Sequence, residues 1–217
     1  MDPDFLEKAT PALDLYEGKS EGKSLGKNDV IICADEKTGL QALKREVANR
    51  LAGPGRGQLV ETTYSREGTI IYQAGLFVRG GGVQGHVVDR NTRANFEILV
   101  EEIMRSPRCE QADRVFWIVD NGGAHHPATF GEWLEEKYPK AVCVHLPVHA
   151  SWLNQFELYF SVLVRKALSG TDVADTDQLT DRVLGFERFW SQDAEPFQWT
   201  FSASDLERVL ERIPAMS

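Results

Sequence analysis

Residues 114–120, RVFWIVD, form a nearly continuous apolar run that ends in aspartate. A strand with apolar side chains on both faces has to be covered on both sides, as in sheets that carry helices on each face. A second run of this kind, DVIICAD at residues 29–35, also ends in aspartate. The two runs predict central strands of a sheet that lies between two layers of helices.

The pattern along the rest of the chain predicts the other elements of such a fold. We expect strands at residues 59–64 and 141–146, a hairpin over 68–89 that turns at 80–82, and helices over 91–105, 127–138, 149–168, 176–190 and 202–213. Strands followed by alternating strands and helices indicate an α/β fold with a mixed sheet and packed helices. We divide the chain into an N-terminal amphipathic piece and linker (1–28), a core (29–170), and C-terminal helices packed on that core (171–217).

The composition excludes some functions and leaves others open. With 33 acidic and 24 basic residues, the chain has a formal charge of −9, which argues against a protein that coats nucleic acid. It does not argue against a nuclease, because carboxylates that bind cations also add negative charge. An odd number of cysteines, no signal peptide and no apolar run of membrane-spanning length predict a soluble cytoplasmic protein with reduced thiols and no membrane partner.

Asp35 and Asp120 each follow an apolar strand. For a single aspartate after a strand, a role in a turn or a cap is a sufficient explanation, and Asn121 and Gly122 make a good turn signal after Asp120. Two such residues on neighbouring strands have a further consequence, since they place two carboxylates at one edge of a sheet, where α/β proteins bind ligands. We therefore expect Asp35 and Asp120 to belong to one site.

Glu157 lies in the helix predicted over residues 149–168, HASWLNQFELYFSVLVRKAL. At about 100° per residue, six apolar side chains share an arc of roughly 80° with Glu157 at its rim. These six are Leu153, Phe156, Phe160, Leu163, Val164 and Ala167. An ionised carboxylate that faces an apolar interior is disfavoured unless a cation pairs with it. That cation is either a lysine or arginine in a structural salt bridge, or a metal ion shared with Asp35 and Asp120.

The metal alternative has a defined chemistry. Carboxylates without an accompanying pattern of cysteine or histidine favour Mg²⁺ or Mn²⁺. Two such ions at a sheet edge activate an attacking oxygen and stabilise a leaving oxygen in phosphoryl transfer. The sequence thus predicts a site for two metal ions made by Asp35, Asp120 and Glu157.

Three stretches resemble a known family: CADEKTGLQAL (33–43), VDNGGAHH (119–126) and the helix over 149–168. They are similar to the transposases of the mariner-like superfamily, in particular to its bacterial insertion-sequence branch, the six-thirty family. The C-terminal stretch that begins with DTDQLTDRVLGFERFW is also similar to that branch, so the resemblance covers nearly the whole chain from about residue 29. The turn with Gly122 and Gly123 differs slightly from the family pattern, although Asn121 and His125 are kept.

The resemblance implies a ribonuclease H-like catalytic domain with an Asp-Asp-Glu triad, matched here by Asp35, Asp120 and Glu157. The 37-residue interval between the last two is close to the mid-thirties spacing typical of the superfamily. The family cleaves DNA at transposon ends and transfers the freed 3′-hydroxyl into target DNA. The resemblance also implies TA target dinucleotides, a dimer on paired ends, and a bacterial, nucleoid-associated location. Members normally carry N-terminal helix-turn-helix domains, for which this chain has no room. An isolated catalytic domain, one half of a split gene and a degenerate copy all stay open.

Basic residues flank the expected site. Lys37, Lys44 and Arg45 follow the first aspartate, and Arg165 and Lys166 follow Glu157. Charges of this kind are usually a solvated face. Beside a phosphate site they are equally expected to contact the DNA backbone.

Three other polar residues near the triad have open roles. His125 touches the scissile phosphate, orients Asp120, or is a packed or capping residue. Asn154, one helical turn before Glu157, is expected to face the metal ions or the DNA backbone. Glu36 points to the opposite side of its strand from Asp35 and is expected to be structural or solvated.

Two other functions agree with the same residues. One is a stand-alone nuclease of this fold that does not transpose. The other is a catalytically inactive remnant or regulator that binds DNA or a full-length transposase. The intact triad argues against decay, and metal-dependent nicking of DNA distinguishes the catalytic functions from the inactive one.

Overall fold

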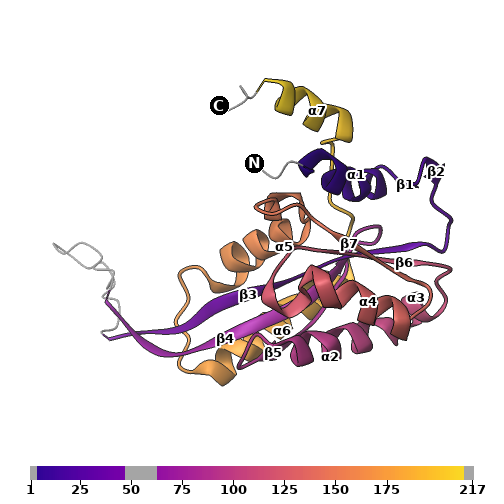
Figure 1. Cartoon of the computed structure of the whole chain (residues 1–217). Coiled ribbons are helices and arrows are strands. Elements are labelled where there is room, and N and C mark those ends of the chain that lie inside the picture. Colours follow the sequence, from indigo (N-terminus) through magenta and orange to yellow (C-terminus); the bar gives the residue numbers. More distant parts are fainter. Residues whose placement is uncertain (1–3, 47–62, 213–217) are drawn as a thin grey trace.

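The computed structural model describes residues 4–46 and 63–212, and its centre is a five-stranded sheet (Figure 1). In spatial order the strands are β5 (Val83–Val88), β4 (Tyr64–Phe77), β3 (Val30–Arg45), β6 (Val115–Val119) and β7 (Ala141–His145). β3, β4 and β5 pair antiparallel, whereas β6 and β7 run parallel to β3. The mixed sheet and the hairpin turn after β4 confirm the sequence-based expectation.

Helices cover both faces of the sheet (Figure 1). One face carries α2 (Arg93–Met104), α3 (Pro107–Glu110) and α4 (Pro127–Lys137), and the other carries α1 (Phe5–Tyr16), α5 (Phe156–Leu163) and α6 (Thr176–Gln192). The side chains of β6 alternate between the two cores. Trp117 and Val119 pack in the cluster of α2 and α4, and Phe116 and Ile118 pack in the cluster of α1 and α5. The apolar run at residues 114–120 is therefore a central strand that is buried on both faces, as predicted.

β3 is longer than the sequence predicts, and the expectation that it ends at Asp35 is wrong. Its parallel pairing with β6 stops at Cys33, which lies opposite Ile118. Its antiparallel pairing with β4 continues, with Asp35 opposite Ala74, as far as Arg45. The polar residues after Asp35 stay extended because β4 supplies a partner for their backbone groups. The strand predicted at residues 59–64 falls mostly outside the described residues, and β4 begins at Tyr64.

The two ends of the described chain pack together. The expected linker contains a small hairpin of β1 (Lys19–Ser20) and β2 (Lys23–Ser24). α1 belongs to the same apolar cluster as α5, with Ala9 and Leu13 fully buried. α7 (Ala203–Glu211) packs against α1, and α6 packs against the antiparallel strands (Figure 1).

The three cysteines are free thiols, and Cys33 and Cys109 are buried, as expected. Within the described residues, no helix combines the length and the apolar character needed to cross a bilayer.

Candidate active site

Asp35 and Asp120 lie together at the edge of the sheet where β6 ends. Asp120 directly follows β6, and Asp35 stands two residues beyond the last parallel pair between β3 and β6. One possible ligand atom from each of Asp35, Asp120 and His125 lies within 4.8 Å of the other two. The two aspartates thus converge as the strand-end argument expects, and His125 joins them.

The surroundings of Asp35 disfavour a negative charge. Its side chain is buried, with 7% of the residue exposed, and its one hydrogen-bond donor is the backbone N–H of Glu36 at 2.7 Å. Burial first, and the nearby Asp120 carboxylate second, raise the pKa of Asp35 to about 7. A divalent cation at this point would relieve both effects, and carboxylate oxygens are the ligands that Mg²⁺ and Mn²⁺ prefer. The donor set therefore suits such an ion.

His125 is fully buried and both of its ring nitrogens are engaged. Nδ1 lies 2.9 Å from the backbone oxygen of Asp120 and 3.2 Å from its Oδ1. Nε2 lies 3.1 Å from Oε2 of Glu36. Burial lowers the pKa of His125, but the contacts with Glu36 and Asp120 raise it by more, so the net shift of this pKa is upward. With both nitrogens occupied, His125 orients Asp120 and has no nitrogen left for a metal ion.

Glu36 continues this network away from the site. Its Oε1 accepts a hydrogen bond from Asn91 Nδ2 at 2.5 Å, and the Asn91 oxygen accepts one from Gln73 Nε2 at 2.8 Å. The Gln73 oxygen in turn lies 3.0 Å from His86 Nε2. Glu36, Gln73 and His86 stand opposite one another on β3, β4 and β5, so the chain of hydrogen bonds crosses the sheet.

The importance of these residues does not follow from the sequence pattern. Glu36 is structural, as expected, but it acts through His125 on Asp120 itself. Asn91, Gln73 and His86 were not singled out at all. The signal that would have found them is the register of the hairpin, which aligns three polar residues on adjacent strands and cannot be read from one strand alone.

The glycine after Asn121 is required by the closeness of Asp120 and His125. The Gly122 N–H donates to Asp120 Oδ1 at 2.7 Å. A Cβ at Gly122 would lie 2.9 Å from His125 Cε1, so the buried ring would have to shift, and 3.0 Å from Asp120 Oδ1, which is a tight contact. The slightly unusual turn therefore allows the buried imidazole to pack against the aspartate.

Glu157 lies in the first turn of α5 and is half-buried. Among the described residues it is not part of the cluster whose possible ligand atoms all lie within 4.8 Å of one another. The start of its helix is nevertheless tied to the first aspartate, because Asn154 Nδ2 donates to the backbone oxygen of Ala34 at 3.1 Å. The structure thus brings Asp35 and Asp120 together and leaves the Glu157 carboxylate outside their cluster.

Asn154 does not have the exposed role expected of it. It is 1% exposed, and its Oδ1 accepts a hydrogen bond from the backbone N–H of Phe156. Both ends of the amide are used to join α5 to β3. The expectation that Asn154 faces the metal ions or DNA is therefore wrong.

The apolar face of α5 is also rotated from the predicted one. Tyr159 is fully buried, whereas Val164 is 38% exposed. The helix changes after Leu163 to a π-helical segment, η3 (Val164–Leu168), whose wider turn breaks the 3.6-residue period. The buried face of α5 is formed by Phe156, Tyr159, Phe160 and Leu163 and does not include Val164, the residue of the predicted face that is nearest to Glu157.

The basic residues separate into three groups. Lys37 and Arg165 line the same cavity, of about 420 Å³, beside α5, and Lys37 Nζ lies 5.6 Å from the centre of the Phe160 ring. Lys44 and Lys166 are exposed. Arg45 is engaged instead by Asp172, at 3.4 Å between Nη1 and Oδ2, and by the hydroxyl of Tyr64.

A mixed five-stranded sheet flanked by helices, with paired carboxylates where its central strands meet, defines the ribonuclease H-like class of fold. The sequence comparison is more specific. Residues 30–180 match the family described as DDE superfamily endonuclease, and the chain belongs to that family. No curated protein matches the chain.

The solved structures to which the chain is similar include transposases and an integrase. A pre-cleavage Mos1 transpososome is similar with a TM-score of 0.51 and 13% identity, over 91% of this chain and 65% of that one. The Mos1 mariner paired end complex with Mn has a TM-score of 0.45 and 14% identity, over 91% of this chain and 64% of that one. The catalytic core domain of BIV integrase has a TM-score of 0.41 and 11% identity, over 86% and 97%. This chain spans about two thirds of the Mos1 chains that it matches.

Proposed function

We propose that this chain is the catalytic domain of a DDE-type transposase. It cleaves DNA phosphodiester bonds at transposon ends and joins the freed 3′-hydroxyl to target DNA. The observation that carries the proposal is the convergence of Asp35 and Asp120, on two central strands, inside the region that matches the DDE endonuclease family. A divalent cation would relieve the repulsion between two carboxylates this close, one of them buried, and phosphoryl transfer is the chemistry that divalent ions at such a site support.

We assign the triad as Asp35, Asp120 and Glu157, which would together hold two Mg²⁺ or Mn²⁺ ions. When bound, the ions supply an activated oxygen nucleophile and stabilise the leaving oxygen. His125 Nδ1 is hydrogen-bonded to the Asp120 backbone oxygen and lies 3.2 Å from the Asp120 carboxylate, and Glu36 holds His125 through Nε2. Support for Glu157 comes from its place in the first turn of α5, which Asn154 joins to the residue before Asp35. Its carboxylate has to turn toward the aspartates when metal and DNA bind.

Contacts with the DNA backbone are assigned to Lys37, Arg165, Lys44 and Lys166. Lys37 and Arg165 support this assignment best, because they line one cavity beside α5 and the structure records no carboxylate within ion-pair distance of either, among the residues that it describes. Arg45 is assigned a structural role because Asp172 already pairs with it.

The proposal extends to the biology that the mariner-like resemblance implies. The Mos1 structures are paired-end complexes, and by analogy we infer that this chain forms a homodimer on paired transposon ends and uses TA targets. We also assign it to the bacterial insertion-sequence branch, acting on nucleoid DNA in the cytoplasm.

Metal-dependent nicking of DNA tests the proposed function. Supercoiled plasmid is incubated with the protein in Mn²⁺, Mg²⁺ or EDTA, and Asp120→Asn is compared with Asp113→Asn as the matched control. Asp113 is exposed and lies at the other end of the same strand. We expect the loss of the Asp120 charge to slow nicking at least about 100-fold, a barrier increase of about 2.7 kcal/mol, with Asp113→Asn unchanged. Equal rates for the two variants would refute a catalytic role of Asp120.

The separation of Glu157 from the aspartate cluster favours a second candidate, an inactive remnant or regulator that binds DNA or a full-length transposase. Binding of DNA without any metal-dependent nicking would favour it. Nicking without joining of a 3′-hydroxyl end to target DNA would instead indicate a stand-alone nuclease.

A further inference from the structure

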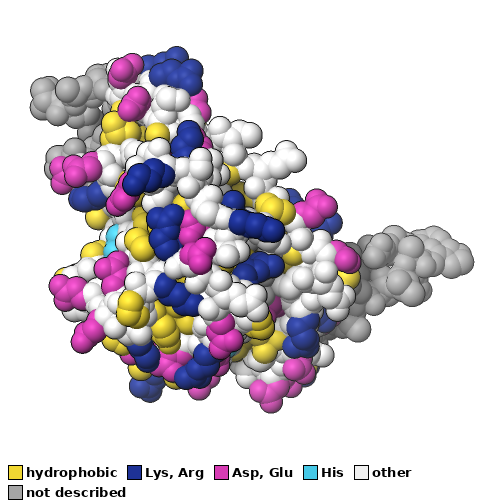
Figure 2. Space-filling model, turned by 90° about the vertical axis from the view of Figure 1, so that its right-hand side faces the viewer, with side chains coloured by type: hydrophobic (Ala, Val, Ile, Leu, Met, Phe, Trp, Pro, Cys, Tyr) yellow, Lys and Arg dark blue, Asp and Glu magenta, His cyan; other side chains and the backbone are white. Residues whose placement is uncertain are grey.

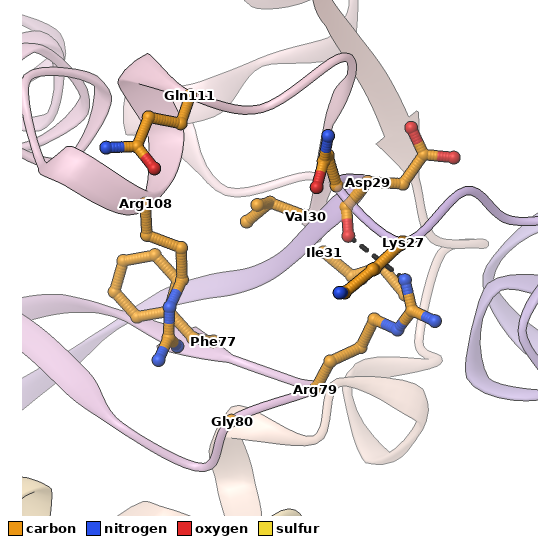
Figure 3. Close-up of a pocket in the computed structure, with 10 residues that line it drawn as sticks. Lys27, Asp29, Val30, Ile31, Phe77, Arg79, Gly80, Arg108 and Gln111 are labelled. Carbon is orange, nitrogen blue, oxygen red and sulfur yellow. Dashed lines mark hydrogen bonds between the residues drawn. The ribbon is translucent and has the colours of Figure 1, made fainter.

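A basic pocket lies at the opposite edge of the sheet from the aspartates. It has a volume of about 410 Å³ and is formed where β3 begins and β4 ends, with Val30, Ile31 and Phe77 among its lining residues. Figure 3 shows the Arg108 side chain on one side of the pocket and those of Lys27 and Arg79 on the other. Figure 2 views the molecule from the side on which β3 begins, and Lys and Arg side chains gather across the middle of that face.

The two arginine side chains are held in place by contacts that leave their charge unpaired. The Arg79 Nη1 donates to the backbone oxygens of Gly26, at 2.8 Å, and Asp29, at 3.2 Å, the second of which is the dashed line in Figure 3. The Arg108 guanidinium lies over the Phe77 ring, 5.0 Å from its centre. It also packs so closely on Gly80 that a Cβ there would collide with it.

No carboxylate in the described part of the chain lies within ion-pair distance of Lys27, Arg79 or Arg108. The acidic residue of the pocket, Asp29, is engaged elsewhere: its Oδ2 accepts from Arg114 Nη2 at 2.6 Å and from the Gly26 N–H. The hydrogen bond from Arg114 lowers the pKa of Asp29 most strongly, which keeps this pair charged. The pocket therefore presents three cations around one carboxylate that already pairs with Arg114, and the charge of Arg79 also contributes to lowering the pKa of that carboxylate. This excess of positive charge lies in a chain whose formal charge is −9.

We propose that this pocket binds a phosphate group of DNA at a point separate from the catalytic carboxylates. Guanidinium groups recognise phosphate oxygens with several parallel N–H donors, and here two of them and an ammonium group surround one cavity. Its volume, within the range of ligand sites, accommodates a phosphate with part of its sugar, and the side-chain amides of Asn28 and Gln111 line the same space. Only the choice of DNA as the source of the phosphate rests on the proposed function.

The pocket and the aspartates are distinct sites. Asp35 is the fifth residue after Val30, which lines the pocket, along β3, and five steps of about 3.3 Å each give a distance of about 17 Å. That span exceeds a single phosphodiester step. One duplex therefore does not place the same phosphate at both sites, and the pocket holds either a distant part of the cleaved DNA or a second duplex.

The salt dependence of DNA binding by the full chain, measured in EDTA, tests the proposal. The test variant is Lys27→Gln combined with Arg108→Gln, and the matched control is Arg188→Gln, an exposed arginine on α6. Each phosphate contact that is lost reduces the magnitude of the slope of log K against log[salt] by about 1. We therefore expect the magnitude of the slope to fall by about 2 in the double variant and to stay unchanged in the control. Arg108→Lys retains the charge and is expected to keep the slope of the wild type. Thermal unfolding of every variant confirms that the fold is retained.

The sources of phosphate are distinguished in parallel. Inorganic phosphate, a mononucleotide and a duplex are each tested for thermal stabilisation at matched ionic strength, with and without the Lys27 and Arg108 changes. Stabilisation by duplex that these two changes abolish supports the proposal. The proposal would be overturned if only the mononucleotide stabilised the protein or if the wild type did not bind duplex. It would also be overturned if the double variant had the same salt slope as Arg188→Gln.

These results are separable from those of the nicking experiment. A protein that binds duplex through the pocket but never nicks DNA supports the pocket and contradicts the proposed function. If the protein nicks DNA but the Lys27 and Arg108 variant has an unchanged salt slope, the proposed function is supported and the proposal that the pocket binds DNA phosphate is refuted.

Discussion

Replacement of Asp35 by asparagine is expected to stabilise the metal-free protein at neutral and alkaline pH. The buried Asp35 has a pKa raised to about 7, whereas an aspartate in an unfolded chain titrates near 3.9. Between these two values the folded protein keeps a proton that the unfolded chain releases. The free energy of unfolding therefore falls as pH rises through this window and is lowest above pH 7. Asparagine has no proton to lose and removes this decline.

The size of the effect follows from the two pKa values. The full difference of about 3 pKa units corresponds to about 4 kcal/mol above pH 8. At pH 5.5 a little more than half of it is already present, so the advantage of Asp35→Asn is expected to grow by about 2 kcal/mol between pH 5.5 and pH 8.5. For a chain of this length, the melting temperature of Asp35→Asn relative to that of the wild type is therefore expected to be about 4–8 °C higher at pH 8.5 than at pH 5.5. Thermal unfolding in EDTA at the two pH values measures it.

Glu187 provides the control for this experiment. Burial also raises the pKa of Glu187 to about 7, and it accepts a hydrogen bond from the Tyr72 hydroxyl, far from the aspartates in sequence. Relative to the wild type, Glu187→Gln is therefore expected to become more stable as pH rises, as Asp35→Asn does. Unlike Asp35→Asn, it is expected to remain stabilised by Mn²⁺. If Asp35→Asn gains nothing between pH 5.5 and pH 8.5, the inferred burial and repulsion at Asp35 are refuted. If it still responds to Mn²⁺ like the wild type, Asp35 is not a metal ligand.

Three further substitutions test the network around the site. Glu36→Gln removes the carboxylate that raises the pKa of His125, so we expect that pKa to fall, measured by NMR titration, and nicking to slow; an unchanged pKa would contradict the assigned contact. Gly122→Ala is expected to slow nicking at least tenfold by displacing the His125 ring while the melting temperature changes little, and normal kinetics would show that the loop tolerates the Cβ. Asn154→Ala leaves the Ala34 oxygen without its donor and is expected to lower the free energy of unfolding by about 2 kcal/mol, measured by urea denaturation. A decrease below about 0.5 kcal/mol would show that Asn154 does not stabilise the junction of α5 and β3.

The parts of the fold that sequence predicted best are those decided within one element. The run at residues 114–120 is apolar on both faces, so its burial between two layers follows from local pattern alone. The helix α2 is of the same kind, because Phe96, Leu99 and Ile103 recur at helical spacing and are all buried.

The parts that were missed depend on partners far away in the chain. Residues 36–45 alternate too weakly to indicate a strand by themselves, and only pairing with β4 keeps them extended. The link from Glu36 to His125 needs the register of that pairing together with the loop after β6. The change to a π-helix after Leu163 breaks the helical period that the sequence pattern continues, and Val164 therefore lies outside the buried face.

The position of Mn²⁺ in crystals of the protein bound to DNA shows directly whether Asp35, Asp120 and Glu157 bind two metal ions. Anomalous scattering locates the ions without any assumption about ligands. The account predicts two peaks, one between Asp35 and Asp120 and one between Asp35 and Glu157, with Glu157 turned toward the aspartates and His125 still hydrogen-bonded to Asp120. A single ion bound by Asp120 and His125, with Glu157 turned away, or no ion at all beside DNA, would contradict it.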